Sequence, residues 1–230
     1  MPAATFRLIG SGVYSLPEAE RLTKIPRKRI RRWMEGYNFI SSGKRHYSPP
    51  VIESAIGRDT GELALTFQDL VEVRFLEAFL RKGVTWKEMR IGAARAKALL
   101  TMTHPFSSRR FKTDGRYILA EIAGADSPVL LNLSRNQLEF HAIINPLLQG
   151  LEFNQFDEPE RWFPMTKRKG VVIDPARAFG APIVIDGGVP TRVLAASARA
   201  ERSQRLTARL YDVPLRAVRS AVYYETKFLA

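Results

Sequence analysis

The chain has 230 residues, of which 45% are hydrophobic and none is cysteine, and its formal charge at neutral pH is +13. This length and apolar content allow one large or two to three small globular domains and exclude a disordered chain. The absence of cysteine excludes a disulfide framework, a thiolate metal site and a cysteine nucleophile. The charge favours a polyanionic partner: nucleic acid, an anionic membrane or an acidic protein.

The sequence carries no run of about 18 to 20 apolar residues, the length that a membrane-spanning helix needs. Its first residues, MPAATFRLIGSG, lack the charged start and long apolar core of a signal peptide. We therefore predict a soluble, cytoplasmic protein with no membrane-spanning segment.

The first third of the chain predicts a helix-turn-helix. Ser15 and Glu18 have the spacing of a capping box, and apolar residues follow at helical intervals, which predicts a short helix over residues 16–23. Pro26 disfavours helical geometry at Ile25 but suits the start of a second helix. The two helices are thus separated by a tight turn.

Two extended runs follow the second predicted helix, over residues 39–47, and they flank a Ser-Gly tip that predicts a β-hairpin wing. Thr66 then begins a helix with one apolar stripe, which includes Phe67, Phe75 and Phe79 and ends at Lys82-Gly83. Thr85 begins a further helix that extends to about residue 100.

The second predicted helix is amphipathic and cationic. Ile30 and Trp33 share its apolar face, whereas the opposite face is almost entirely basic. Like charges four residues apart, as in Arg27 with Arg31, cost a few tenths of a kcal/mol, and a bound polyanion relieves that repulsion. Duplex DNA in the major groove, RNA, and a solvated or membrane-facing helix all remain open as explanations.

For binding to double-stranded DNA, the sequence predicts three groups of contacts. In a helix-turn-helix, the N-terminal part of the second helix faces base edges, and the cations placed there are Arg27, Lys28 and Arg31. Arg29 and Arg32 are expected to hold phosphates, and Lys44 and Arg45 at the wing tip are expected to grip the neighbouring backbone.

Beyond residue 103 the sequence predicts a small α+β section over residues 104–165. Residues 116–122, 129–132 and 151–156 are expected to be strands, and residues 140–148 a short helix. A basic segment at 166–170 precedes strands at 171–174 and 183–186. The turn Gly187-Gly188 then leads to helices from Thr191 to about Phe228.

The tail repeats the pattern of the head with a shift of 188 residues, so that Ile25 and Pro26 fall on Val213 and Pro214. Any two apolar helices joined by a proline-marked turn would align this well, so the sequence leaves open whether the match is more than coincidence.

Residues 10–100, with YSLPEA, IP and RRW before the wing and TFQDL after it, resemble the MerR-type winged helix-turn-helix. The chain departs from MerR regulators afterwards, because no long dimerisation helix follows and no cysteine could sense a metal. The resemblance implies a DNA-binding domain. Because the chain lacks the dimerisation helix and the cysteines of MerR regulators, activation by a sensed ligand has no support in the sequence.

Residues 171–226, with VIDP, FGAPIV, GGVPT and YDVP, resemble the small domain of VapB-like antitoxins encoded beside PIN-like toxins. The two resemblances together imply an antitoxin of a type II toxin-antitoxin system. Such a protein neutralises a PIN-like ribonuclease and represses its own operon. Because PIN-type toxins hold divalent metal with clustered carboxylates, the candidate toxin-binding residues are the cations Arg199, Arg202, Arg205 and Arg209, although exposed solubilising arginines would look the same.

Nothing in the sequence predicts catalysis. The three histidines, His46, His104 and His141, are far apart and lack ligand spacing, and no phosphate-binding glycine pattern is present, so we expect no enzyme, no metal site and no cofactor. We expect a homodimer or larger complex on an inverted-repeat operator. The alternatives are a stand-alone MerR-like transcription regulator without a toxin partner and an RNA-associated binding protein.

The predicted fold class is α+β. It comprises a mostly helical winged helix-turn-helix domain at 1–103, a small β-rich middle section at 104–165, and a small helical, antitoxin-like domain at 166–230 that binds toxin, dimerises or does both.

Overall fold

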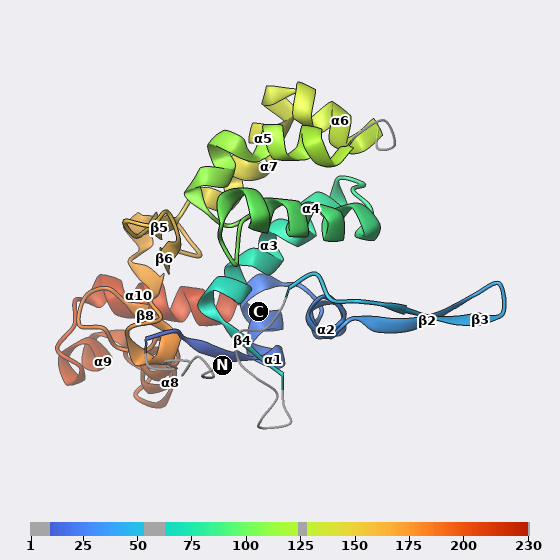
Figure 1. Ribbon diagram of the computed structural model, residues 1–230. Coiled ribbons are helices and arrows are strands. Elements are labelled where there is room, and N and C mark those ends of the chain that lie inside the picture. Colours follow the sequence, from blue (N-terminus) through green and yellow to red (C-terminus); the bar gives the residue numbers. More distant parts are fainter. Residues whose placement is uncertain (1–9, 53–62, 124–127, 230) are drawn as a thin grey trace, which may run out of the picture. The chain divides into compact units, whose positions relative to one another are not determined.

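A computed structural model of the chain describes residues 10–52, 63–123 and 128–229, and these form two compact units. The head unit contains the described residues between 14 and 149 together with 153–159. The tail unit contains residues 10–13, 150–152 and 160–229. Each combines helices with small antiparallel sheets (Figure 1), which confirms the α+β class. The division into three domains remains a prediction.

The head unit is mostly helical. Its helices are α1 (Leu16–Thr23), α2 (Arg27–Glu35), α3 (Phe67–Arg81), α4 (Trp86–Leu100), α5 (Arg109–Ala123), α6 (Pro128–Arg135) and α7 (Gln137–Leu148). Its strands form two-stranded sheets: β1 (Val13–Ser15) with β4 (Ala64–Thr66), and β2 (Tyr37–Ser41) with β3 (Lys44–Ser48). The expected helices over 16–23, 67–81 and 86–100, and the hairpin, are therefore confirmed.

Phenylalanine rings fill the core of the head unit. Phe79 of α3 meets the rings of Phe106 and Phe111, each at 6.0 Å between centroids, and Phe111 in turn meets Phe140 of α7 at 6.0 Å. All four side chains are at most 1% exposed. Burial of such large side chains is the main source of stability for this unit.

The strands predicted at 116–122 and 129–132 are wrong, because both segments are helical, in α5 and α6. The buried positions of α5 are Phe111, Gly115, Ile118 and Leu119, which recur at helical spacing. A window that begins at residue 116 misses the first half of this stripe and leaves only a β-prone run. Gly115 also lets the helices approach closely, since a Cβ there would lie 2.7 Å from Cζ of Phe140.

The tail unit has a four-stranded sheet in the order β5-β6-β7-β8, comprising β5 (Leu151–Phe153), β6 (Pro159–Trp162), β7 (Val171–Ile173) and β8 (Pro182–Val184). Its helical elements are η2 (Lys167–Lys169), η3 (Ala178–Gly180), α8 (Thr191–Ala200), α9 (Gln204–Leu210), α10 (Leu215–Tyr223) and η4 (Tyr224–Phe228). The strands expected near 151, 171 and 183 and the C-terminal helices are confirmed, with ends shifted by one to three residues.

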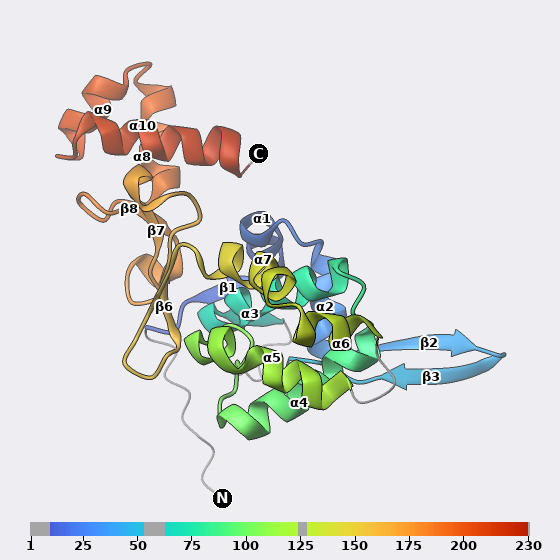
Figure 2. The same ribbon diagram turned by 90° about the horizontal axis from the view of Figure 1, so that it is seen from above.

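The tail sheet packs through small apolar side chains, among them Val172 and Ile183, which form a buried cluster with Phe163. The turn Gly187-Gly188 follows β8, and both residues have positive φ (83° and 68°), a conformation that glycine adopts without strain. The hydroxyl of Thr191, at the start of α8, donates a hydrogen bond to Glu225 of η4. This contact joins α8 to η4, and Figure 2 shows α8, α9 and α10 grouped together.

The two turns related by the 188-residue shift have a positive φ at the corresponding residue. Lys24 and Asp212 are both left-handed, with φ of 61° and 49°. The buried residues Ile25 and Val213 follow, and then a proline at the N-cap of the next helix. The tail unit therefore contains a second helix-turn-helix, α9 and α10.

Candidate nucleic-acid interface

The first helix of the helix-turn-helix is held by a complete capping box. The Ser15 hydroxyl accepts a hydrogen bond from the Glu18 amide, and the Glu18 carboxylate accepts one from the Ser15 amide at 2.9 Å. Buried Leu16 and Leu22 pack the helix against the unit. It ends at Lys24, whose left-handed conformation turns the chain toward α2.

The turn brings α2 to a fixed position. Ile25 is 2% exposed and anchors the turn in the core, and Pro26 caps α2 with φ of −54°. The backbone amide of Arg27 donates to Oε1 of Glu20 on α1 at 3.2 Å. This contact satisfies one of the amides that a helix N-terminus leaves without a partner, and it joins the two helices.

α2 buries its apolar face as predicted. Ile30, Trp33 and Met34 are at most 4% exposed. Trp33 stacks on Trp86 of α4 with 6.0 Å between ring centroids, and its carbonyl oxygen accepts hydrogen bonds from the amides of Val51 and Ile52. The rest of the helix surface therefore points away from the core.

The predicted base-reading cations all lie on this outward surface. Arg27, Lys28 and Arg31 are exposed. Nε of Arg27 lies 3.8 Å from Oε2 of Glu20. Within the described part of the chain, no carboxylate pairs with Lys28 or Arg31 at 4 Å or less. The like-charge repulsion between Lys28 and Arg32, four residues apart, is thus not offset by an ion pair among the described residues.

The two predicted phosphate contacts on α2 have partners within the protein. Nη1 of Arg29 lies 3.0 Å from Oε1 of Glu77 on α3, and its guanidinium lies 5.8 Å from the ring centroid of Trp33. Arg32 lies over the ring of Tyr37 at 5.3 Å. These contacts hold both guanidinium groups in place. The sequence could not show the Glu77 pairing, because 48 residues separate the partners.

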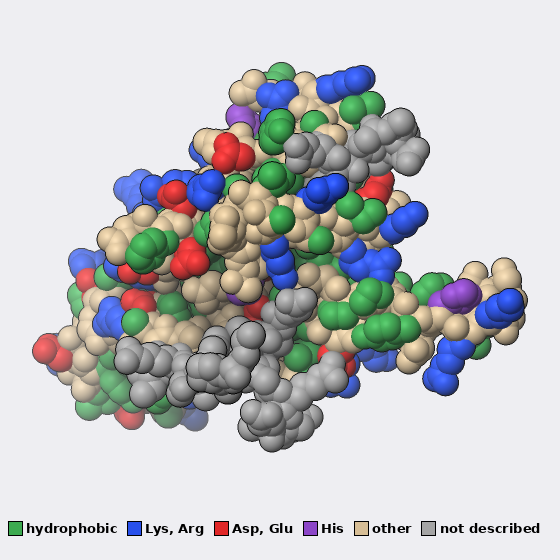
Figure 3. All heavy atoms as spheres, viewed as in Figure 1, with side chains coloured by type: hydrophobic (Ala, Val, Ile, Leu, Met, Phe, Trp, Pro, Cys, Tyr) green, Lys and Arg blue, Asp and Glu red, His purple; other side chains and the backbone are tan. Residues whose placement is uncertain are grey.

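The wing is a regular hairpin whose strands pair from Tyr37 with Ser48 to Ser41 with Lys44. Its two-residue turn is Ser42-Gly43, and both residues have positive φ, as a type I′ turn requires. The hairpin extends away from the helices of the head unit in Figures 1 and 2. Lys44 and Arg45 are exposed next to its tip, and Figure 3 shows cationic side chains at that end.

Side chains at the base of the wing fix it to the helices. The Tyr47 hydroxyl donates to the carbonyl oxygen of Glu35 at 2.9 Å, and Nε1 of Trp86 donates to the Ser48 hydroxyl at 3.1 Å. Phe39 stacks on His46 at 5.4 Å farther along the hairpin. These contacts hold the base of the hairpin against the helices, and the hairpin in turn positions the tip.

The four cations proposed for toxin binding lie in the tail unit and are all exposed. The structure places these four cations on different elements. Arg199 is on α8, Arg202 lies in the connection with a left-handed φ of 51°, and Arg205 and Arg209 lie one turn apart on α9. Only the last two share one helix face.

None of the helices in the described ranges combines the length and the apolar composition that a bilayer-spanning helix requires. Among the same residues, no three histidine or carboxylate side chains are grouped so that they could hold a metal ion.

The class of protein that this arrangement defines is a helix-turn-helix protein with a hairpin wing after its second helix and a separate tail unit. No family model matches the chain. The chain is 27% identical over 223 residues to a Mycobacterium tuberculosis protein named "Putative antitoxin VapB45", and the match covers 91% of this chain and 92% of that protein. It is also similar to the crystal structure of Rv2018 from Mycobacterium tuberculosis, with a TM-score of 0.69, 26% identity, and coverage of 91% and 96% of the two chains.

Proposed function

We propose that the protein is the antitoxin of a type II toxin-antitoxin pair, that it neutralises a PIN-like ribonuclease toxin, and that it binds operator DNA to repress its own operon. Similarity along nine-tenths of the chain to a protein named as an antitoxin supports the toxin-directed half of this function. The coverage of both chains is nearly complete, so the likeness extends beyond a shared DNA-binding domain.

The outward surface of α2 supports the DNA-directed half. Arg27, Lys28 and Arg31 extend from the N-terminal part of the second helix of a helix-turn-helix, which is the part that reads base edges in the major groove. Arg32 and the wing residues Lys44 and Arg45 are the proposed phosphate contacts, and Arg29 shares that role with its pairing to Glu77. A dimer would bind an inverted repeat with half-sites about one helical turn apart.

The tail unit is the proposed partner of the toxin or of a second copy of this chain. Its exposed Arg199, Arg202, Arg205 and Arg209 would face the carboxylates that hold divalent metal in a PIN-like toxin. Covering or neutralising such a cleft would block its ribonuclease activity.

The toxin-directed half is tested by co-expressing the chain with the protein encoded by the adjacent gene. We expect the two proteins to co-purify and the chain to inhibit the ribonuclease activity of its partner in a stoichiometric manner. If no protein encoded by an adjacent gene binds the chain, the antitoxin role is overturned. The chain would then be a stand-alone transcription regulator.

The DNA-directed half is tested by titrating DNA from upstream of the gene at two salt concentrations. Because phosphate contacts release counterions, the four proposed phosphate contacts of each protomer would lower the affinity by about two orders of magnitude between about 50 and 200 mM salt, and the eight of a dimer by about four. RNA that competes as strongly as the upstream DNA contradicts the winged-helix proposal.

A further inference from the structure

A groove of about 700 Å³ lies in the head unit, away from the helix-turn-helix, between α5 and α7. Its lining residues come from α5 and α7 together with Phe153, the last residue of β5, which belongs to the head unit; they are Arg109, Lys112, Thr113, Arg116, Gln137, His141, Leu148 and Phe153. Among these described residues three are permanent cations and none carries a carboxylate. The groove is therefore strongly cationic.

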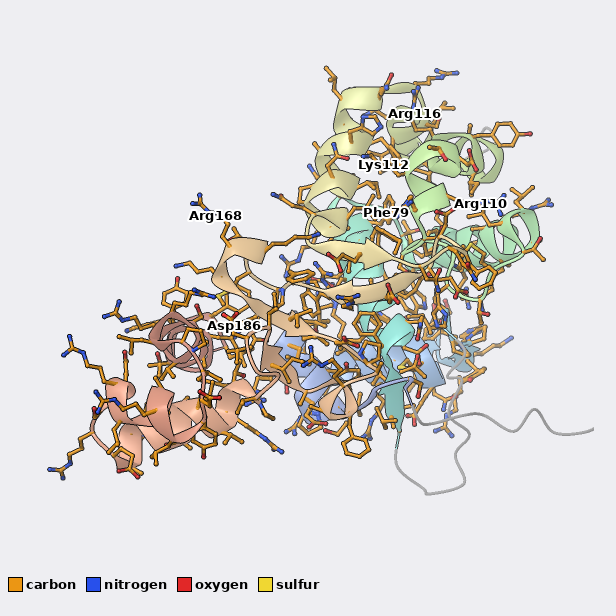
Figure 4. The ribbon with its side chains drawn as sticks, turned by 90° about the vertical axis from the view of Figure 1, so that its left-hand side faces the viewer. Phe79, Arg110, Lys112, Arg116, Arg168 and Asp186 are labelled. Carbon is orange, nitrogen blue, oxygen red and sulfur yellow. The ribbon has the colours of Figure 1, made fainter. Side chains whose placement is uncertain are left out.

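The cations share one side of α5 because of their spacing. Residues 109, 112, 113 and 116 fall within about 100° of one another around a helix with 3.6 residues per turn. Figure 4 shows Lys112 and Arg116 following each other along α5, whereas Arg110 extends to another side of the helix. The opposite side of α5 is buried through Phe111 and Ile118.

Two of the cations are held in place before any ligand binds. Nε of Arg116 donates to the carbonyl oxygen of Ser134 at 2.9 Å, and its Nη2 donates to that of Arg135 at 3.2 Å. Arg109 lies 5.0 Å from the ring centroid of Phe153, and its Nε is 3.6 Å from Oδ1 of Asp157. Because neutral carbonyls hold Arg116, its charge stays available to an anion, while that of Arg109 is partly compensated.

Lys112, unlike Arg109 and Arg116, has no polar partner among the contacts described for the groove. Its side chain is exposed, and no ion pair joins it to a carboxylate of the described residues. Lys112 and Arg116 thus present two charges one helical turn apart, a spacing of about 6 Å that suits two nearby carboxylates.

The other lining residues indicate what kind of anion fits. Gln137 and His141 offer polar groups that can bond to a peptide backbone, and Leu148 and Phe153 offer apolar surface. A duplex phosphate backbone needs no apolar contacts, whereas sites of about 300 to 1,000 Å³ with apolar walls and a few placed polar groups suit compact groups that are partly apolar and partly polar. These features favour a peptide over nucleic acid.

We infer that this groove binds an acidic peptide segment of the toxin partner, with carboxylates at Lys112 and Arg116 and an apolar side chain against Leu148 and Phe153. This inference rests on the proposed antitoxin function and adds a second toxin contact, in the head unit. Charge complementarity selects the occupant, because a site with three cations and no lining carboxylate disfavours a neutral or basic segment.

The test compares two charge reversals in the full-length chain, Lys112→Glu in the groove and Lys87→Glu on α4, an exposed lysine that does not line it. The affinity for the co-expressed neighbour-encoded toxin is measured by calorimetry. We expect Lys112→Glu to weaken binding about tenfold or more and Lys87→Glu to leave it within about twofold. Upstream-DNA affinity should be the same for both variants.

A second readout uses the absence of cysteine in the chain. Thr113→Cys introduces a unique thiol in the groove, and Lys87→Cys introduces one outside it. Bound toxin should slow alkylation of the first thiol about tenfold or more and leave the second unchanged, as followed by mass spectrometry.

The outcomes separate the groove from the proposed function. A toxin complex that forms with unchanged affinity in Lys112→Glu, or with no protection at residue 113, overturns the groove while the antitoxin function stands. Weakened DNA binding by Lys112→Glu with unchanged toxin binding also overturns it, because the groove would then contact nucleic acid. A wild-type chain that binds no toxin overturns both.

Discussion

Nη1 of Arg29, on α2, lies 3.0 Å from Oε1 of Glu77, on α3. The Glu77 side chain is only 7% exposed, and its Oε1 also accepts a hydrogen bond from Nε of Arg81 at 2.6 Å. A buried carboxylate is costly unless it is paired, and this contact pairs Glu77 while it joins α2 to α3. The most cationic helix of the protein therefore uses one of its charges for its own support.

We expect Arg29→Ala to lower the free energy of unfolding by about 1–2 kcal/mol, because it removes a charge-assisted hydrogen bond from a buried carboxylate. The loss is smaller than for a fully buried pair, since Arg29 is half-exposed and Arg81 remains. Lys28→Ala, on the outward face of the same helix, should change it by less than about 0.5 kcal/mol. Urea denaturation measures both, and equal small losses would show that the pairing contributes nothing.

The double variant Arg27→Ala with Arg31→Ala should abolish selection of the operator. Both side chains are exposed on α2, so the free energy of unfolding should stay within about 0.5 kcal/mol of the wild type. If each arginine reads a base, selectivity over unrelated DNA should fall about tenfold or more per arginine. The matched control, Lys87→Ala with Arg135→Ala, removes two exposed cations of the same unit.

Fluorescence anisotropy with operator and scrambled duplexes checks this prediction. Selectivity that survives the double change would refute the major-groove assignment of α2. An unfolded double variant would instead refute the assignment of Arg27 and Arg31 to the outward face.

The helix-turn-helix and the wing were predictable because their signals are local. The capping residues Ser15 and Glu18, the proline at 26 and the Ser-Gly tip each act within a few residues, and the structure confirms the helices and hairpin they predicted. The outward position of the cations on α2 followed from helical periodicity alone.

The remainder depended on contacts between distant residues. The pairing of Arg29 with Glu77 spans 48 residues, and the groove needs α5, α7 and Phe153 of β5 together. The segment 116–122 was misassigned because its β-prone residues belong to a longer helical stripe that begins at Phe111. Tertiary packing there overrides local propensity.

Gly36, which joins α2 to the wing, should not tolerate a side chain. Its φ of 73° and ψ of −174° are almost restricted to glycine, and a Cβ would collide with the carbonyl oxygen of Ser48 and lie 2.7 Å from Oη of Tyr47. We expect Gly36→Ala to lower the free energy of unfolding by about 3 kcal/mol or more, from backbone strain and overpacking together.

Gly83→Ala is the matched control, because Gly83 also has positive φ (90°) but no atom within 4 Å of an added Cβ. It should cost about 1–2 kcal/mol from backbone strain alone. Gly36→Ala should in addition speed tryptic cleavage at Lys44 and Arg45, because an added Cβ displaces Tyr47 and Ser48, which hold the base of the wing. Equal costs for the two variants would refute the steric argument.

A buried polar network joins α3 to the segment that precedes α5. Nε2 of His104 lies 2.8 Å from Oδ1 of Asp69, whose Oδ2 accepts hydrogen bonds from Thr66 at the start of α3. The carboxylate of Glu72 accepts hydrogen bonds from the amides of Phe106 and Ser107 at 3.1 and 2.7 Å.

Burial raises the pKa of Glu72 above 4.5. Burial alone would lower the pKa of His104, but the hydrogen bond and charge of Asp69 and the charge of Glu72 outweigh it and raise that pKa above 6.5.

These shifts predict that the protein becomes less stable as the pH rises. A raised pKa in the folded state means that the folded chain binds more protons than the unfolded one, so the His104 contribution is complete below about pH 6.5 and is lost as the pH rises through the folded pKa. The free energy of unfolding in urea should thus be lower at pH 8.5 than at pH 6. His104→Gln, which can still donate to Asp69, should flatten this decline, whereas His46→Gln, on the exposed wing, should keep the wild-type slope. A decline as steep in His104→Gln as in the wild type would mean that another group carries the proton.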